Sequence, residues 1–247
     1  MLVLAQVSDT HIDGGPRNTE RAARVMDHVR GLPVDAVLIT GDIAEHGAAV
    51  EYEIAREVLA SPFPTVLCPG NHDDRARLRE AFPDPSGTGR PDAPVNRALD
   101  LDGLSILLAD STVPGEIHGY LDDPTVAWLE EALAERRDVP TVIGMHHPAA
   151  PVGIPYVDRL SLWEPSRLEA VVRRNPQVVA VIAGHAHLAG ATGFAGVPLT
   201  IAPATVNTAL TPAESALEWP VDHDLPPGLA LHVWTGSHLT THARVCP

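Results

Sequence analysis

The sequence predicts an α/β protein in which helices cover a largely buried sheet. Short apolar runs alternate along the chain with longer amphipathic segments, and glycine, proline, aspartate or asparagine bounds the apolar runs. Strands that alternate with helices in this way form sheets whose faces are covered by helices. The 247-residue chain is 45% hydrophobic and 20% charged, which excludes a disordered or fibrous protein. We expect one domain over residues 1–247.

The apolar runs define the expected strands, which are Leu2–Val7, Ala36–Thr40, Thr65–Cys68, Leu104–Ala109, Thr141–Gly144, Val178–Ala183, Leu199–Ala202 and Leu229–Trp234. The amphipathic segments define the expected helices, which are Thr19–Arg30, Ala48–Ala60, Asp74–Ala81, Pro124–Arg136 and Pro165–Arg174. Pro124 and Pro165 suit the first turn of a helix. Pro83–Pro94 is a loop by composition, and residues 203–228 are expected to be irregular.

The net charge of −15 limits the partners of the protein. It argues against broad contact with nucleic-acid phosphates or anionic membranes, and it is compatible with metal cations. The first residues lack a basic region and a polar motif follows them at once, so we interpret them as a strand and not as a signal peptide. No apolar stretch is long enough for a transmembrane helix. The two cysteines are too few for a disulfide framework, and we expect a cytoplasmic protein.

Polar side chains follow five of the predicted strands directly. The segments are Ser8-Asp9-Thr10-His11, Gly41-Asp42, Gly70-Asn71-His72-Asp73, His146-His147-Pro148 and Gly184-His185-Ala186-His187. Ligand sites in open α/β sheets form outside the carboxyl ends of the strands. His, Asp and Asn side chains are ligands for first-row transition metals. The five segments supply more of these side chains than one tetrahedral ion can bind. They suit two ions that clamp a substrate, with Asp42 as the natural bridge between them.

These five blocks, in this order, resemble the calcineurin-like metallophosphoesterases, whose pattern is D-x-H, GD, GNH-[D/E], H and GHxH. The resemblance implies a four-layer αββα sandwich formed by a single metallophosphoesterase domain. It implies that Asp9, His11, Asp42 and His187 hold one metal ion, and that Asp42, Asn71, His146 and His185 hold the other. His72 would lie beside the ions as a catalytic residue that is not a ligand. The ligand set accepts manganese, iron, zinc or cobalt, and we expect manganese or iron.

Local details resemble the class III cyclic-nucleotide phosphodiesterases and the bacterial glycerophosphodiesterases of the same branch. They include SDTHI, TGDIAEHG, PGNHDDR and DST at 110–112. The resemblance implies hydrolysis of a small phosphodiester, with 3′,5′- or 2′,3′-cyclic nucleotides first and glycerophosphodiesters as the alternative. A phosphomonoesterase, a nuclease and a metal-binding scaffold without turnover are further alternatives. His46 and Leu188 depart from the common pattern and leave the substrate open. Related enzymes are often dimers or larger, so a homo-oligomer is compatible with the sequence.

Several residues near the blocks have two interpretations. His147 either orients its loop or contacts substrate, and Asp73 either supports a ligand or caps a helix. His46 either is solvated or lines the mouth of the site. The arginines at 75, 77 and 79 either form a solvated helix face, which we favour, or bind phosphate. Similarly, Tyr156, Asp158 and Arg159 either belong to an ordinary loop or cap the site.

Overall fold

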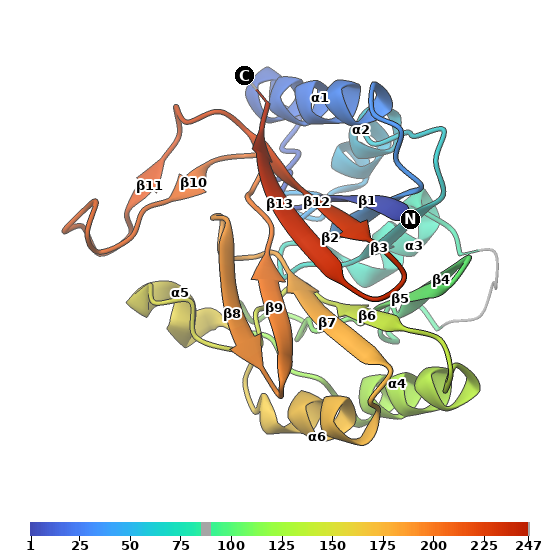
Figure 1. Cartoon of the computed structure of the whole chain (residues 1–247). Helices are drawn as coiled ribbons and strands as arrows, with labels where there is room; N and C mark the ends of the chain where they lie inside the picture. The colour runs from blue at the N-terminus through green and yellow to red at the C-terminus, as the bar shows by residue number, and fades with distance from the viewer. Residues whose placement is uncertain (85–89, 247) are drawn as a thin grey trace.

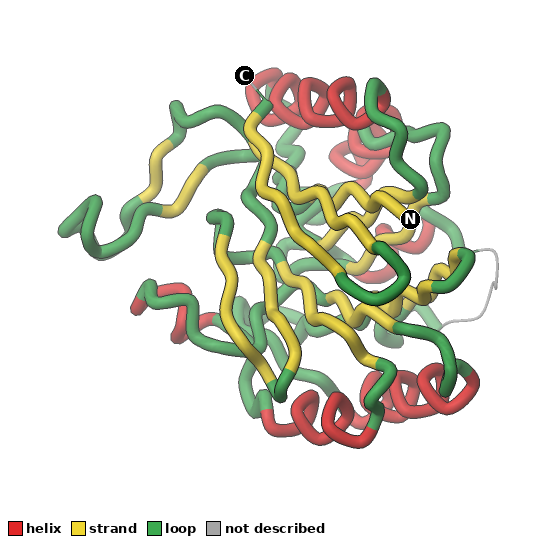
Figure 2. Tube along the Cα trace, viewed as in Figure 1, coloured by secondary structure: helices red, strands yellow, loops and turns green. Residues whose placement is uncertain are grey.

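The fold is a four-layer sandwich in which two sheets lie face to face with helices outside them, as Figures 1 and 2 show. The computed structural model describes residues 1–84 and 90–246, so part of the predicted Pro83–Pro94 loop lies outside the described residues. The helices are α1 (Pro16–Arg30), α2 (Ala49–Val58), α3 (Arg75–Ala81), α4 (Asp123–Glu135), α5 (Pro155–Leu160) and α6 (Ser166–Arg174). The strands are β1 (Leu2–Val7), β2 (Ala36–Thr40), β3 (Thr65–Cys68), β4 (Arg97–Leu101), β5 (Leu104–Leu108), β6 (Thr141–Gly144), β7 (Val178–Ala183), β8 (Gly190–Phe194), β9 (Val197–Ile201), β10 (Thr208–Ala209), β11 (Val221–Asp222), β12 (Gly228–Trp234) and β13 (Leu239–Val245).

The first main sheet has antiparallel strands at one edge, and the second has them at both edges. The first has the order β13-β12-β1-β2-β3, with β1, β2 and β3 parallel. The second has the order β4-β5-β6-β7-β9-β8, with β5, β6, β7 and β9 parallel. The short pair β10-β11 extends away from both sheets as a hairpin arm (Figure 1). The carboxyl ends of the central strands therefore face one edge of the sandwich, where the polar motifs follow them.

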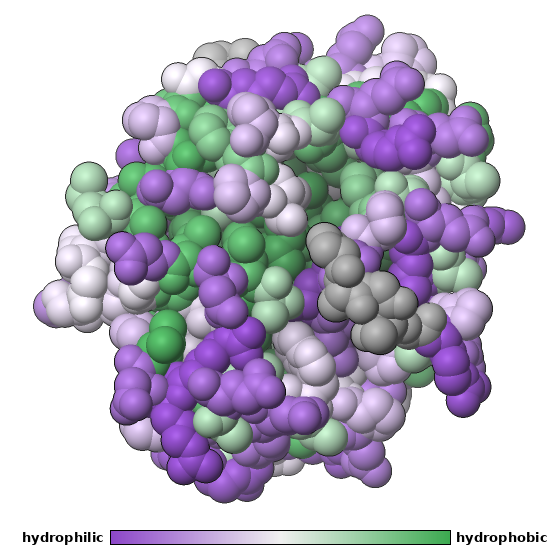
Figure 3. Space-filling model, turned by 90° about the vertical axis from the view of Figure 1, so that its right-hand side faces the viewer, coloured by the Kyte–Doolittle hydropathy of each residue, from purple (hydrophilic) through white to green (hydrophobic). Residues whose placement is uncertain are grey.

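Side chains alternate between the two faces of each strand, and the buried apolar side chains therefore form three separate layers. In β2, Ala36 and Leu38 face the space between the two sheets, whereas Val37 and Ile39 face α1 and α2. The layer between the sheets also contains Ile106 and Ile182 from the second sheet. A third cluster packs the other face of the second sheet against α4 and α6. The four-layer αββα architecture is thus confirmed. On the face in Figure 3, hydrophobic residues gather in the centre and left of the view, and hydrophilic residues cover much of the rest.

Most of the expected elements are present with small shifts at their ends. Strands β1, β2, β3, β6 and β7 have the predicted bounds, and α1 begins earlier than predicted, at Pro16. Helix α3 begins at Arg75 because Asp74 is its N-cap and accepts a hydrogen bond from the Arg77 amide. Pro165 is the N-cap of α6 and not a residue of its first turn. The sequence analysis missed β4, β8, β13 and α5, and it missed β10 and β11 because residues 203–228 were expected to be irregular. In residues 1–84 and 90–246, no helix is both long and apolar enough to cross a membrane.

A buried polar network lies between the sheets below the motif loops. The Gln6 amide donates to Thr40 Oγ1 at 2.8 Å and to the Ala183 carbonyl at 2.9 Å, which joins the two sheets. Its oxygen accepts a hydrogen bond from His232 Nε2 at 2.9 Å, and His232 Nδ1 lies 2.8 Å from Thr241 Oγ1. Both ring nitrogens are thus satisfied in the neutral tautomer. Burial lowers the pKa of His232 from 6.5 to about 4.

This lowered pKa makes the stability of the fold depend on pH. The unfolded chain takes up a proton at His232 below about pH 6.5, whereas the folded chain does so only near its lowered pKa of about 4. The stabilisation that neutral His232 contributes is fully present above about pH 6.5, its pKa in the unfolded chain. It is lost as the pH falls toward about 4, its pKa in the folded protein. We expect His232 to lower the free energy of unfolding by about 2 kcal/mol between about pH 7.5 and pH 5. Denaturant unfolding at both values should show a smaller decrease for His232→Gln, and equal decreases would contradict this assignment.

Candidate metal centre

The predicted site residues meet where the carboxyl ends of β1, β2, β3, β6 and β7 face the same edge of the sandwich. Every residue of the predicted ligand set is in this cluster and is buried or half-buried; the set is Asp9, His11, Asp42, Asn71, His146, His185 and His187. The loops are held together by backbone hydrogen bonds, including those from the Asp9 amide to the Gly41 carbonyl and from the His11 amide to the Asp42 carbonyl. The fold therefore converts five separate motifs into one site.

The backbone of the cluster is strained at most of these residues. Left-handed φ angles occur at Asp9 (56°), His11 (44°), Asp42 (49°), His185 (66°) and His187 (53°). Such a conformation costs roughly 1–3 kcal/mol at a residue with a side chain, and it persists where surrounding structure imposes it. Strain concentrated on one polar cluster is typical of a functional site. It turns these side chains toward a common point immediately after their strands end.

Asp42 lies at the centre of the cluster. Its Oδ2 atom is 3.3 Å from His11 Nε2 and 3.3 Å from His146 Nε2. Gly70 permits this position, because a Cβ atom at residue 70 would lie 2.1 Å from Asp42 Oδ1. Burial opposes the charge of Asp42, but His146 and His11 outweigh it and hold the pKa of this carboxyl well below its usual range. Asp42 is therefore an ionised carboxylate with one oxygen facing two groups of histidines.

One group of donor atoms lies on the His11 side of Asp42. His187 Nε2 is 3.2 Å from His11 Nε2 and 3.4 Å from Asp9 Oδ1. The donor atoms of Asp9, His11, Asp42 and His187 all lie within 4.8 Å of one another. Burial opposes the charge of Asp9, but the contact with His187 outweighs it and brings the pKa of this carboxyl down to about 2. This group offers two carboxylates and two imidazoles.

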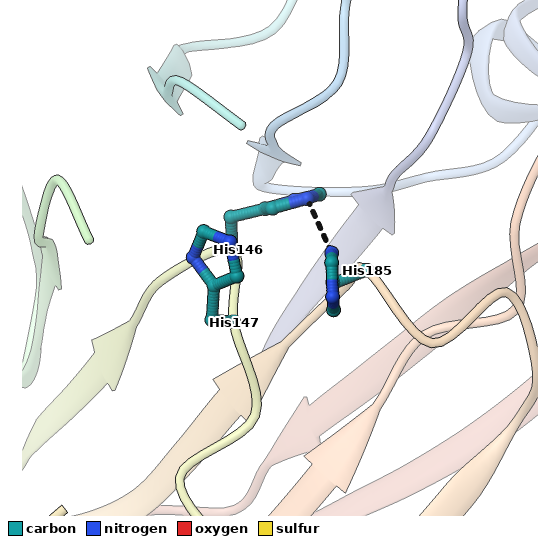
Figure 4. Close-up of side chains that lie close together, drawn as sticks. All are labelled: His146, His147 and His185. Atoms are coloured by element: carbon teal, nitrogen blue, oxygen red, sulfur yellow. Dashed lines mark hydrogen bonds between the residues drawn. The ribbon is translucent and has the colours of Figure 1, made fainter. Parts of the chain in front are cut away.

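A second group of donor atoms lies on the His146 side. His146 Nε2 is 3.2 Å from Asn71 Oδ1 and 3.2 Å from His185 Nδ1. Figure 4 shows His146 and His185 pointing toward one another across this contact, with the ring of His147 to one side. Ligand atoms that surround one ion at about 2.0–2.2 Å are themselves about 3 Å apart. The donor sets on both sides of Asp42 therefore fit a metal ion each.

Three of these histidines are oriented by a hydrogen bond from the ring nitrogen that faces away from the donor cluster. His11 Nδ1 lies 2.6 Å from Glu45 Oε2, His146 Nδ1 lies 2.8 Å from the Thr40 carbonyl, and His187 Nδ1 lies 2.6 Å from Asn207 Oδ1. An acceptor at Nδ1 fixes the proton there and leaves the lone pair on Nε2. Such outer partners orient metal-binding imidazoles and raise their basicity. The sequence analysis missed both Glu45 and Asn207.

His147 does not share this arrangement. Its Nδ1 lies 2.8 Å from Ser111 Oγ and its Nε2 lies 2.9 Å from the Ile117 carbonyl, so both ring nitrogens are occupied. Burial, with the nearby His185 and His146, holds the pKa of His147 well below its usual range. His147 is therefore a neutral side chain bonded to two loops, which favours the interpretation that it orients its own loop.

His72 stands beside the donor cluster on its solvent side. Its side chain is 36% exposed, and its ring meets that of His11 edge-on at 4.7 Å between centroids. His72 Nδ1 lies 2.8 Å from the Glu45 carbonyl, which leaves Nε2 without a partner among the described residues. The His72 amide donates to Asp42 Oδ1 at 3.0 Å. The residue is thus tied to the Asp42 carboxylate by its backbone, while part of its ring is open to solvent.

Asp73 fastens two motif loops together. Its carboxylate accepts hydrogen bonds from the amides of Ile43, Ala44 and Gly70. The Tyr52 hydroxyl also donates to it at 3.0 Å. Burial raises the pKa of Asp73 to about 6. Asp73 therefore supports the ligand loops, and its neighbour Asp74 is the helix cap.

Comparison with known proteins agrees with this geometry. Residues 2–189 match the calcineurin-like phosphoesterase family. The chain belongs to that family. It is 36% identical over 219 residues to the glycerophosphodiester phosphodiesterase GpdQ of Enterobacter lignolyticus, covering 83% of this chain and 78% of that one. It is 34% identical over 221 residues to a cAMP/cGMP dual specificity phosphodiesterase of Mycobacterium tuberculosis, covering 83% and 68%.

Solved structures share the fold of this calcineurin-like phosphoesterase. A dimetal phosphatase from Danio rerio has a TM-score of 0.75 at 14% identity and covers 100% of this chain and 96% of its own. A purple acid phosphatase from yellow lupin has a TM-score of 0.72 at 15% identity, over 99% of this chain and 51% of its own. The expected family and branch are confirmed. The protein is a metallophosphoesterase, a hydrolase whose cofactor is a divalent metal.

A cavity of about 410 Å³ opens beside Asn71 and His72 in this calcineurin-like phosphoesterase. Arg75 forms part of its wall, and its guanidinium contacts Asp110 Oδ2 and the Thr112 carbonyl, both at 2.8 Å. Arg77 donates to the Gly47 carbonyl, and Arg79 donates to the Pro94 carbonyl. Arg75 and Arg79 are partly buried and anchor loops, which corrects the favoured interpretation as a solvated helix face for these two. Arg77 is exposed, as that interpretation expects.

The remaining candidates pair with residues outside the donor cluster or line another cavity. His46 is largely exposed and pairs with Glu51 at 2.7 Å. Asp158 accepts a hydrogen bond from the Val152 amide. Tyr156 and Arg159 line a separate cavity of about 290 Å³, whose lining includes none of the predicted ligands.

Proposed function

We propose that the protein is a phosphodiesterase for small diesters that works with two metal ions joined by Asp42. The observation that carries the proposal is the position of Asp42 Oδ2, 3.3 Å from one histidine of each donor group. Asp9, His11, Asp42 and His187 would hold one ion, and Asp42, Asn71, His146 and His185 the other. Manganese and iron suit this mixed set of imidazole, carboxylate and amide donors, and zinc or cobalt would also fit it.

Metal ions held there would supply Lewis acidity toward the phosphate oxygens and a hydroxide nucleophile at neutral pH. The other roles in the reaction would belong to residues of the chain. The Asp42 carboxylate, fixed by the His72 amide, keeps both halves of the centre in register. His72 lines the cavity beside Asn71, and its Nε2 would give a proton to the leaving alcohol or stabilise its charge. The cavity would hold the organic part of the diester.

The substrate class follows from the relatives together with this cavity. The similarity to a dual specificity cAMP/cGMP phosphodiesterase supports cyclic nucleotides. The similarity to a glycerophosphodiester phosphodiesterase supports glycerophosphodiesters as the alternative. The charge of −15 argues against extended nucleic acid as a substrate. Both cysteines are free and buried, in keeping with a cytoplasmic enzyme.

A substrate panel tests the proposal. Bis(p-nitrophenyl) phosphate, p-nitrophenyl phosphate, 3′,5′-cAMP, 2′,3′-cAMP and glycerophosphocholine would be assayed with added manganese and after chelation. We expect the diesters to be cleaved faster than the monoester, and chelation to abolish cleavage. Preference for the monoester, or activity that survives complete metal removal, would contradict the proposal. The best natural diester ranks the two substrate candidates.

A further inference from the structure

Residues 203–209 form a strap that crosses the metal centre after the family motifs have ended. The family match ends at residue 189, whereas the strap follows β9 and ends with β10, the first strand of the arm. The amide of Thr205 donates to the Ser8 carbonyl and that of Val206 to the Asp9 carbonyl, both at 3.1 Å. The amide of Ala209 donates to the His187 carbonyl at 2.9 Å. The strap therefore binds the backbone of two predicted ligands, both of which have left-handed φ angles.

The opposite side of the strap is anchored to α1. Arg21 is buried, and its Nε donates to the Thr205 carbonyl at 2.9 Å. Its Nη2 donates to the Leu225 carbonyl at 2.7 Å, beyond the arm. The amide of Gly228, at the start of β12, donates to the Ala204 carbonyl at 3.2 Å. Hydrogen bonds therefore hold the strap on both sides of Asn207, whose side chain reaches the centre.

Asn207 makes the side-chain contact of the strap with the centre. Its Oδ1 atom lies 2.6 Å from His187 Nδ1. An amide oxygen only accepts hydrogen bonds, so Nδ1 of His187 carries the proton and Nε2 carries the lone pair. His187 Nε2 is the atom that lies 3.2 Å from His11 Nε2 and 3.4 Å from Asp9 Oδ1. The contact thus selects the tautomer whose free nitrogen faces the other donors.

We propose that Asn207 is a positioning residue that sets the metal affinity of the Asp9–His11–His187 half of the centre. The inference rests on the dinuclear centre proposed above. His146 obtains the same orientation from a backbone carbonyl in the core, and His11 obtains it from a carboxylate three residues after Asp42. His187 instead depends on a side chain of the strap, which comes from outside the family motifs. Loss of this side chain frees the ring to rotate and to exchange its tautomer.

The test compares Asn207→Ala, Asn207→Asp and the wild-type protein in equilibrium dialysis against manganese. We expect the wild type to bind two ions, and Asn207→Ala to bind one of them about 10–100-fold more weakly, as is typical when an outer partner of a ligand is removed. Asn207→Asp keeps an oxygen acceptor and should restore tight binding. The visible spectrum of the cobalt-substituted proteins gives a second readout, because it reports the ligand geometry of each ion. It should change in the alanine variant and return in the aspartate variant.

Asn175→Ala is the matched control. Asn175 also uses its side-chain amide, as a donor to the Val171 carbonyl at the end of α6, remote from the motif loops. It should bind both ions as the wild type does. If the wild type binds two ions and Asn207→Ala binds both with unchanged affinity, the role of Asn207 is wrong and the centre stands. Weak binding by both Asn207→Ala and Asn207→Asp would also overturn the role. A wild-type protein that binds no ion overturns the proposed function itself.

Discussion

Replacement of Asp42 by alanine is expected to reduce the metal content to one ion or none and to lower kcat at least about 10³-fold. The variant removes the oxygen that lies 3.3 Å from one histidine of each donor group. It also removes the negative charge of the Asp42 carboxylate. Several kcal/mol of charge stabilisation at a metal centre corresponds to three or more factors of ten in rate. Elemental analysis of the purified variant and its rate on the best diester would measure the two effects.

Asp27→Ala is a suitable control for this change. Asp27 is an exposed aspartate on α1 that pairs with Arg30, so its loss should alter neither metal content nor rate. Two tightly bound ions and wild-type turnover in Asp42→Ala would exclude Asp42 as the bridge.

Replacement of His72 by alanine is expected to separate binding from turnover. The ring of His72 touches the cluster edge-on, and its Nδ1 is bonded to a backbone carbonyl and not to a donor atom. The variant should therefore retain two ions. Its kcat should fall by about 10²–10⁴-fold, which is the usual contribution of a positioned proton donor. Metal analysis and steady-state kinetics on the same preparation would test both statements.

His46→Ala provides the comparison, because His46 is a neighbouring histidine that is exposed and paired with Glu51. It should leave the rate on small diesters unchanged. A rate for His72→Ala near that of the wild type would show that this residue takes no part in the reaction. Loss of metal from His72→Ala would instead show that it acts as a ligand.

The fold was predictable because its central strands are short, apolar and buried on both faces. Strand β2, for example, consists of five buried residues, and its bounds agree with the prediction. The missed strands lie at sheet edges. Strand β13 is largely exposed and carries threonine, histidine and arginine, and β8 is rich in glycine and alanine. Neither sequence contains the apolar run that marks a buried strand.

The candidate site was predictable to the extent that its residues follow strands directly. Asp9, Asp42 and His146 each come within two residues of a strand end, so the topology alone brings them together. Their supporting partners were not predictable in this way. Asn207 is separated from His187 by 20 residues in a segment that is irregular by composition, and only the folded strap brings the two together. The two bonds that define the role of His147 likewise come from distant loops.

The central claim is that one carboxylate joins two ions in each chain, and electron paramagnetic resonance of the manganese-loaded protein tests it most directly. Two ions that share a ligand at roughly 3.5–4 Å are magnetically coupled, whereas isolated ions are not. We predict two manganese ions per chain, a coupled spectrum in the wild type and its loss in Asp42→Ala. A single ion per chain, or two ions without coupling, would contradict the account.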